Sequence, residues 1–153
     1  MLTKYGLLQV LDLSANRLTS LPEGLLAKVH YLRSASFANN SISTVPKRLF
    51  RDQAGSLEVL DFSHNRIVRF EPEAFADLKR LKQLRLSHNN LQVLHPQSLK
   101  GLESLELVNL GSNNLLVLPD SLFRQVPNLQ VKKSHWFGHV KWESMKQRSH
   151  VMK

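Results

Sequence analysis

One pattern recurs along this chain at a nearly fixed period. The pattern reads Leu-x-x-apolar-x-apolar-x-x-Asn-x-apolar, and its copies are 24, 25, 24 and 24 residues apart. The five copies open at Leu8, Leu32, Leu57, Leu81 and Leu105. A repeat of this length predicts a solenoid, in which each copy forms one coil and stacked coils share a continuous core.

The apolar columns of the repeat predict its local structure. The alternation that opens each copy is the two-residue period of a short strand with one buried face, and one strand per coil makes a curved parallel sheet. The buried strand residues are Leu11 and Leu13, Ala35 and Phe37, Leu60 and Phe62, Leu84 and Leu86, and Val108 and Leu110. The convex half of the core is filled from the eighteenth position by Leu26, Phe50, Phe75, Leu99 and Phe123.

An unbroken column of asparagine follows each strand. Its members are Asn16, Asn40, Asn65, Asn89 and Asn113. An asparagine side chain carries both donors and an acceptor, so it can satisfy backbone groups that would be buried without partners where the coil turns. We expect replacement of Asn65 to destabilise the fold more than replacement of Asn16 or Asn113, because Asn65 has coils on both sides.

These columns resemble the leucine-rich repeat family over roughly residues 2–130, and the repeat length near 24 is similar to its typical subclass. The resemblance implies an α/β solenoid whose curved parallel sheet lines the concave side, with irregular or short helical segments on the convex side. It also implies a non-enzymatic scaffold that binds a protein ligand on the concave face. Such repeats are common in extracellular and cell-surface proteins, while intracellular repeat proteins with a Leu-Pro signature provide the alternative of an intracellular scaffold or regulator.

The two ends of the sequence depart from the repeat. We expect residues 1–130 to form the repeat arc and residues 131–153 to form a disordered basic tail, which holds six Lys and Arg residues against one Glu and so carries +5 of the net charge of +9. A sixth repeat fails, since polar residues occupy its core positions.

The sequence has no cysteine for disulfide-linked caps, no secretory signal and no apolar run that spans a membrane. We interpret the chain as a fragment of a longer extracellular or cell-surface protein, or as the product of an alternative transcript or a partial gene model. Its uncapped ends favour self-association.

The concave face is the predicted binding site. Its outward residues combine apolar and polar types suited to a protein surface, and Asp61 should pair with Arg85 across neighbouring strands, with His64 and His88 pairing more loosely. The alternative interpretation is a solvated sheet face held by ordinary cross-strand pairs. The predicted binding residues are Val59, Asp61, His64, Gln83, Arg85, His88, Leu107 and Asn109.

Other chemistry finds little support in the sequence. We expect no catalytic residues, cofactor or metal, since the chain lacks a phosphate loop, a nucleophile elbow and cysteine, and the pair His64 and His88 lacks a third ligand. His135 and His139 flank Gly138 in the tail and lack the glutamate of a zinc protease.

Two further motifs leave alternatives open. Trp136, Phe137 and Trp142 lie among basic residues of the tail, a mixture that can bind nucleic acid or an acidic membrane, although short basic ends are more often simply solvated. Asn39-Asn40-Ser41 forms an N-glycosylation sequon on Asn39, which is usable only in a secreted protein.

Deletion of residues 133–153 tests the predicted tail. We expect circular dichroism and thermal melting of the repeats to remain nearly unchanged, because the core columns fail beyond Val131. A large loss of melting cooperativity would instead identify the tail as a cap on the last coil.

Overall fold

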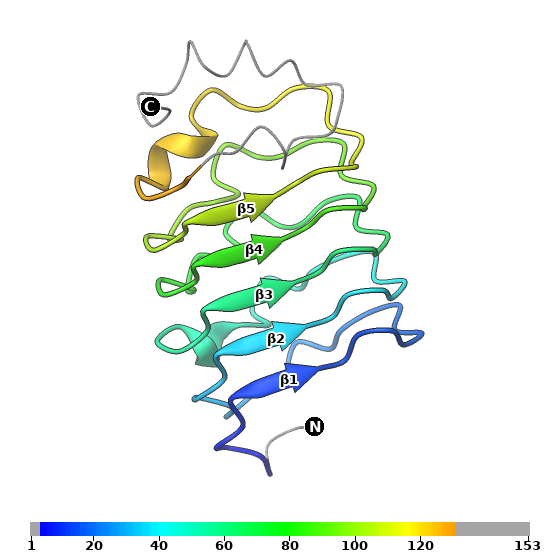
Figure 1. The fold of residues 1–153 in the computed structure, drawn as a ribbon, viewed down its shortest axis with the longest axis vertical. Helices are drawn as coiled ribbons and strands as arrows, with labels where there is room; N and C mark the ends of the chain where they lie inside the picture. Colours follow the sequence, from blue (N-terminus) through cyan, green and yellow to red (C-terminus); the bar gives the residue numbers. More distant parts are fainter. Residues whose placement is uncertain (1–3, 131–153) are drawn as a thin grey trace.

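Five short strands form one parallel sheet along the length of the molecule. The computed structural model describes residues 4–130. The strands β1 (Val10–Asp12), β2 (Ser34–Ser36), β3 (Val59–Asp61), β4 (Gln83–Arg85) and β5 (Leu107–Asn109) lie side by side in chain order (Figure 1). The central residue of each strand, which is buried, pairs with the equivalent residue one repeat away. The predicted solenoid, with one strand per coil, is confirmed.

The segments that return the chain from one strand to the next are mostly irregular. Among residues 4–130, helical structure is limited to two short 3-10 helices, η1 (Arg51–Gln53) and η2 (Leu122–Gln125). Both lie on the side of the sheet from which the chain enters the strands (Figure 1). This agrees with the predicted irregular or short helical convex segments. The prediction of a disordered tail concerns residues 131–153, which lie outside the described residues.

Phenylalanine rings fill the core of the central coils. Phe37 stacks on Phe62 of the next coil with ring centroids 5.0 Å apart, and Phe50 meets Phe62 edge-on at 6.2 Å. Phe75 extends the cluster, 6.1 Å from Phe50. The fully buried Gln53 also connects coils, because its side-chain amide donates to backbone carbonyls of the first coil. Aromatic packing and this amide together fasten neighbouring coils.

The asparagine column ties each coil to the one before it. In the third coil, the Asn65 Oδ1 accepts a hydrogen bond from the backbone N–H of Ile42 at 3.0 Å. Its Nδ2 donates to the carbonyl of Phe37 in the preceding coil and to two carbonyls of its own turn. Asn40, Asn89 and Asn113 repeat this arrangement. The column therefore connects neighbouring coils through buried backbone groups.

The direction of these hydrogen bonds bears on how much stability each asparagine of the column is expected to contribute. Asn113 lies in the last strand-bearing coil, yet it is buried and bonds to Leu86 and Leu91 as fully as Asn65 bonds to its own partners. Within residues 4–130, by contrast, the exposed Asn16 bonds only to carbonyls of its own turn. The stability ranking stays a prediction, but the hydrogen bonds do not distinguish Asn113 from Asn65, because each side chain bonds to its own turn and to the preceding coil.

Gly101 occupies a backbone position that other residues would not fit. Its φ of +82° lies in the left-handed region, and a Cβ atom built there would be 2.1 Å from the carbonyl oxygen of Ala76. Lys28, the equivalent residue of the first coil, also has a positive φ of 64°, so the conformation alone does not require glycine. Glycine is required at position 101 because the backbone of the preceding coil approaches it so closely.

We predict that Asn65→Ala and Asn113→Ala destabilise the protein to a similar degree, by roughly 1–3 kcal/mol, because each leaves buried backbone groups of two coils without partners. Asn16→Ala should cost clearly less. Urea denaturation of the three variants measures the free energy of unfolding. An Asn113→Ala variant as stable as Asn16→Ala would contradict the backward reach of the column.

We also predict that Gly101→Ala destabilises the protein by about 2–4 kcal/mol, since it combines backbone strain with a steric overlap. Gly55→Ala is the matched control, because a Cβ there meets no atom within 4 Å. Thermal melting should show a lower midpoint for Gly101→Ala and a nearly unchanged one for Gly55→Ala. Equal midpoints would exclude the close approach of Gly101 to Ala76.

Candidate functional site

Two columns of outward side chains run along the concave face, which we define as the exposed side of β1–β5. The strand register aligns the first residues of the strands in one column and the last residues in the next. The first column holds Val10, Ser34, Val59, Gln83 and Leu107, and the second holds Asp12, Ser36, Asp61, Arg85 and Asn109. Gln83 separates Val59 from Leu107, so these two predicted apolar contacts flank a polar side chain.

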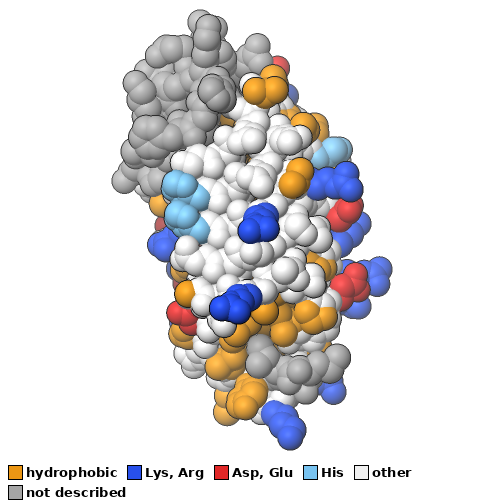
Figure 2. Space-filling model, turned by 90° about the vertical axis from the view of Figure 1, so that its right-hand side faces the viewer, with side chains coloured by type: hydrophobic (Ala, Val, Ile, Leu, Met, Phe, Trp, Pro, Cys, Tyr) orange, Lys and Arg blue, Asp and Glu red, His pale blue; other side chains and the backbone are white. Residues whose placement is uncertain are grey.

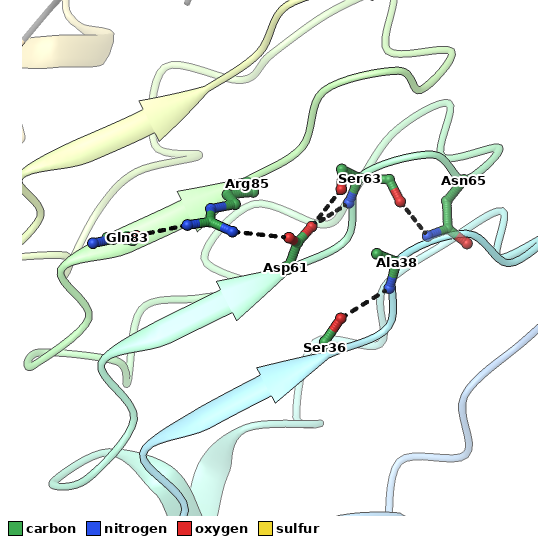
Figure 3. A network of polar contacts seen from close by, with 7 residues as sticks. All are labelled: Ser36, Ala38, Asp61, Ser63, Asn65, Gln83 and Arg85. Atoms are coloured by element: carbon green, nitrogen blue, oxygen red, sulfur yellow. Dashed lines mark hydrogen bonds and ion pairs between the residues drawn. The ribbon is translucent and has the colours of Figure 1, made fainter. Parts of the chain in front are cut away.

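A charged network occupies the centre of this face (Figure 3). The Arg85 Nη1 lies 3.4 Å from the Asp61 Oδ2 on the neighbouring strand, and its Nη2 donates to the Gln83 Oε1 at 3.2 Å. The Arg85 side chain is 48 % exposed, whereas that of Asp61 is 16 % exposed. The structure thus brings three predicted binding residues together and presents a guanidinium to solvent in a fixed position.

Several residues of the second column also shape the turn after the strand. The Asp61 Oδ1 accepts hydrogen bonds from the backbone N–H and the hydroxyl of Ser63, at 2.8 and 2.6 Å (Figure 3). Asn109 accepts in the same way from the N–H of Gly111. In the first coil, hydrogen bonds from Ser14 hold the pKa of the Asp12 carboxyl below its usual value. Sequence reasoning missed this role, although short polar residues that accept from the N–H two places later are common in turns.

Two histidine rings stack at the margin of the face where the strands end. The rings of His64 and His88 are nearly parallel, with centroids 4.2 Å apart, and both residues are exposed. Figure 2 shows adjacent histidine side chains on one margin of the molecule. Within residues 4–130, no group of three or more His, Cys, Asp or Glu side chains lies close enough together to hold a metal ion. The pair therefore offers a flat, polar aromatic surface next to the concave face.

The residue before each ladder asparagine adopts a left-handed backbone. Ala15, Asn39, His64, His88 and Ser112 all have φ between 53° and 55°. Asn39, the asparagine of the sequon, is exposed, while its neighbour Asn40 is half-buried in the column. The structure thus places the candidate glycosylation position on the surface.

A second surface, which sequence reasoning missed, lies where the chain enters the strands. We call it the leading edge and define it by the residues up to five places before β1–β4 that line two hollows, including Tyr5, Leu7, His30, Tyr31, Arg33, Glu58 and Arg80. A sequence signal existed, because Tyr31 directly precedes the opening leucine, where later repeats carry Ser56, Arg80 and Ser104. Its aromatic side chain is exposed.

The described part of the chain carries no membrane-crossing helix. Residues 4–130 contain no helical segment with the length and apolar character that such a helix requires.

Comparison with known proteins identifies the repeat. A family model described as "Leucine rich repeat" matches residues 38–91 and 55–115, and a second model with the same description matches residues 7–28. Leucine-rich repeat-containing protein 3B of Danio rerio is 37 % identical over 71 residues, which cover 46 % of this chain and 28 % of that protein. Human Toll-like receptor 5 is 35 % identical over 74 residues, covering 48 % of this chain and 8 % of the receptor.

A solved structure shows the same architecture. The TLR13–ssRNA13 complex superposes with a TM-score of 0.74 at 30 % sequence identity, and covers 79 % of this chain and 17 % of that one. The similarity therefore spans much less than two thirds of each relative's length.

Proposed function

Because the chain belongs to the leucine-rich repeat family, we propose that it is a non-enzymatic scaffold that recognises a protein ligand on its concave face. One observation carries this proposal: the solvent-exposed Arg85 guanidinium is held by Asp61 and Gln83 at the centre of the sheet. Val59 and Leu107 lie in the adjacent column, one on each side of Gln83. An ordered arginine with apolar side chains nearby is the kind of centre on which protein interfaces depend.

The composition of the face favours a protein over a nucleic acid. Its two central columns contain one arginine, Arg85, against two aspartates, Asp12 and Asp61. Binding to a phosphate backbone rests mainly on several lysine or arginine contacts. The solved TLR13 structure is a complex of that protein with ssRNA13, but the concave face of this chain has few cations with which to hold a nucleic acid.

Three finer assignments remain predictions. They are the typical 24-residue subclass, an extracellular or cell-surface setting within a larger protein, and the absence of enzymatic activity. Toll-like receptor 5 and Leucine-rich repeat-containing protein 3B support the family to which these predictions refer.

We predict that Arg85→Glu weakens partner binding by about tenfold or more, because it places a second negative charge beside Asp61 in a central contact. Reversal of Asp61 should weaken binding too, but it also removes the turn bonds to Ser63. Arg85→Glu is therefore the more informative variant. The partner is first captured by pull-down with the full-length protein, and the affinities of the variants are then compared by surface plasmon resonance.

Lys79→Glu is the control, because Lys79 lies off the concave face and, within the described part of the chain, its side chain forms a single exposed ion pair, with Glu103 at 3.7 Å. Glu73 is less suitable, since it has a positive φ and pairs with Lys100 at 2.6 Å. Loss of binding in Lys79→Glu, with Arg85→Glu unaffected, would refute the concave-face proposal.

A further inference from the structure

The leading edge contains a carboxylate whose charge is already balanced. The Lys82 Nζ lies 2.9 Å from the Glu58 Oε2, and this contact holds the pKa of the Glu58 carboxyl below its usual value. The Glu58 side chain is 23 % exposed. The second carboxylate of this region, Asp52, accepts a hydrogen bond from the backbone N–H of Lys28 at 2.7 Å. Both acidic groups thus have partners within the protein.

Two guanidinium groups in the same place keep most of their donors free. Among residues 4–130, the Arg33 side chain forms a single ion pair, 3.9 Å from Glu58, and is 67 % exposed. The Arg80 Nη1 makes one long hydrogen bond, 3.4 Å to the carbonyl oxygen of Gly55. A guanidinium carries five N–H donors arranged to grip a carboxylate. Arg33 and Arg80 therefore have unused capacity for an anionic group.

A hollow separates these two arginines. Arg33, Arg80, Gly55 and Ser56 line a cavity of about 490 Å³. The hollow lies where Ser56 places a small side chain in the column that carries Tyr31 in the preceding coil and Arg80 in the following one, next to Gly55, which has no side chain. Asp52 and Glu58 also line this hollow, but both already have partners within the protein. A carboxylate that enters the hollow would therefore find its free donors on Arg33 and Arg80.

An apolar hollow adjoins the charged one. It has a volume of about 470 Å³ and is lined by Tyr5, Leu7 and Leu8, and it shares His30 and Tyr31 with the charged hollow. Leu7 is 80 % exposed and Tyr31 58 % exposed. The shared residues make the two hollows one continuous surface with an apolar half and a cationic half.

We propose that the leading edge of the first three coils binds an acidic segment of the protein partner, in which a large apolar side chain lies beside one or more aspartates or glutamates. The apolar side chain occupies the hollow of Tyr5, Leu7 and Tyr31, and the carboxylate lies between Arg33 and Arg80. Exposed tyrosine and arginine are the residue types that contribute most to protein interfaces. The inference rests on the proposed protein-binding function, but it assigns a different surface and a partner chemistry.

A peptide selection on the full-length protein tests this assignment. Random dodecapeptides displayed on phage are selected in parallel on the natural chain and on the double variant Arg33→Glu/Arg80→Glu. We expect the natural chain to enrich sequences that place Asp or Glu beside a large apolar residue. A synthetic copy of one such peptide should bind about tenfold more weakly to the double variant by fluorescence anisotropy. Tyr31→Ser should weaken it as well, because the apolar half is lost.

Arg69→Glu is the matched control, since Arg69 is an exposed arginine beyond the asparagine turn of the third coil. It should bind the peptide like the natural chain, and unchanged melting of all variants should exclude unfolding. Enrichment of basic or uncharged peptides, or full binding to the double variant, would overturn the proposal.

The experiment also separates this proposal from the concave-face function. Partner binding that falls in Arg85→Glu, with no acidic peptide enriched, would leave the concave face standing and reject the leading edge. The opposite result is also possible. If binding of acidic peptides requires Arg33 and Arg80 while Arg85→Glu leaves partner binding unchanged, the concave-face proposal is rejected and the leading-edge proposal is supported.

Discussion

The asparagine column is the interaction on which the rest of this solenoid depends. A coil that turns away from its strand leaves backbone N–H and C=O groups inside the molecule, where water does not reach them. Asn65 bonds with groups of this kind from two coils at once. The same bonds set the spacing and register of neighbouring coils. Strand alignment, the stacking of Phe37 on Phe62 and the columns of the concave face all follow from that register.

The fold and the candidate site share residues at the centre of the sheet. One carboxylate oxygen of Asp61 stabilises the turn after the strand by accepting a hydrogen bond from the Ser63 N–H, and the other accepts from Arg85. The guanidinium is therefore positioned before any partner arrives, which lowers the entropic cost of ordering it on binding. At the leading edge, Arg33 and Arg80 are anchored less tightly, and an anionic partner would order them on binding. The two surfaces thus differ in preorganisation as well as in charge.

Much of the architecture could be predicted from the repeat. A fixed period that combines two-residue alternation with a polar column permits one strand per coil, so the strand residues and their pairing across coils could be assigned without coordinates. The contact between Asp61 and Arg85 followed from the same register, because equivalent positions of adjacent parallel strands are neighbours. The ring stacking of His64 and His88 was expected only as a loose pair, since side-chain torsions are not determined by register.

The sequence by itself determined the solenoid, its register and the residues that face outward, because these depend on periodicity alone. Only the tertiary structure decided features that depend on distances between coils. These include the reach of Asn113 toward the preceding coil, the contact that excludes a side chain at Gly101, and the hollow between Arg33 and Arg80. A repeat pattern records which residues are equivalent, but the space between two coils depends on how side chains from both pack together.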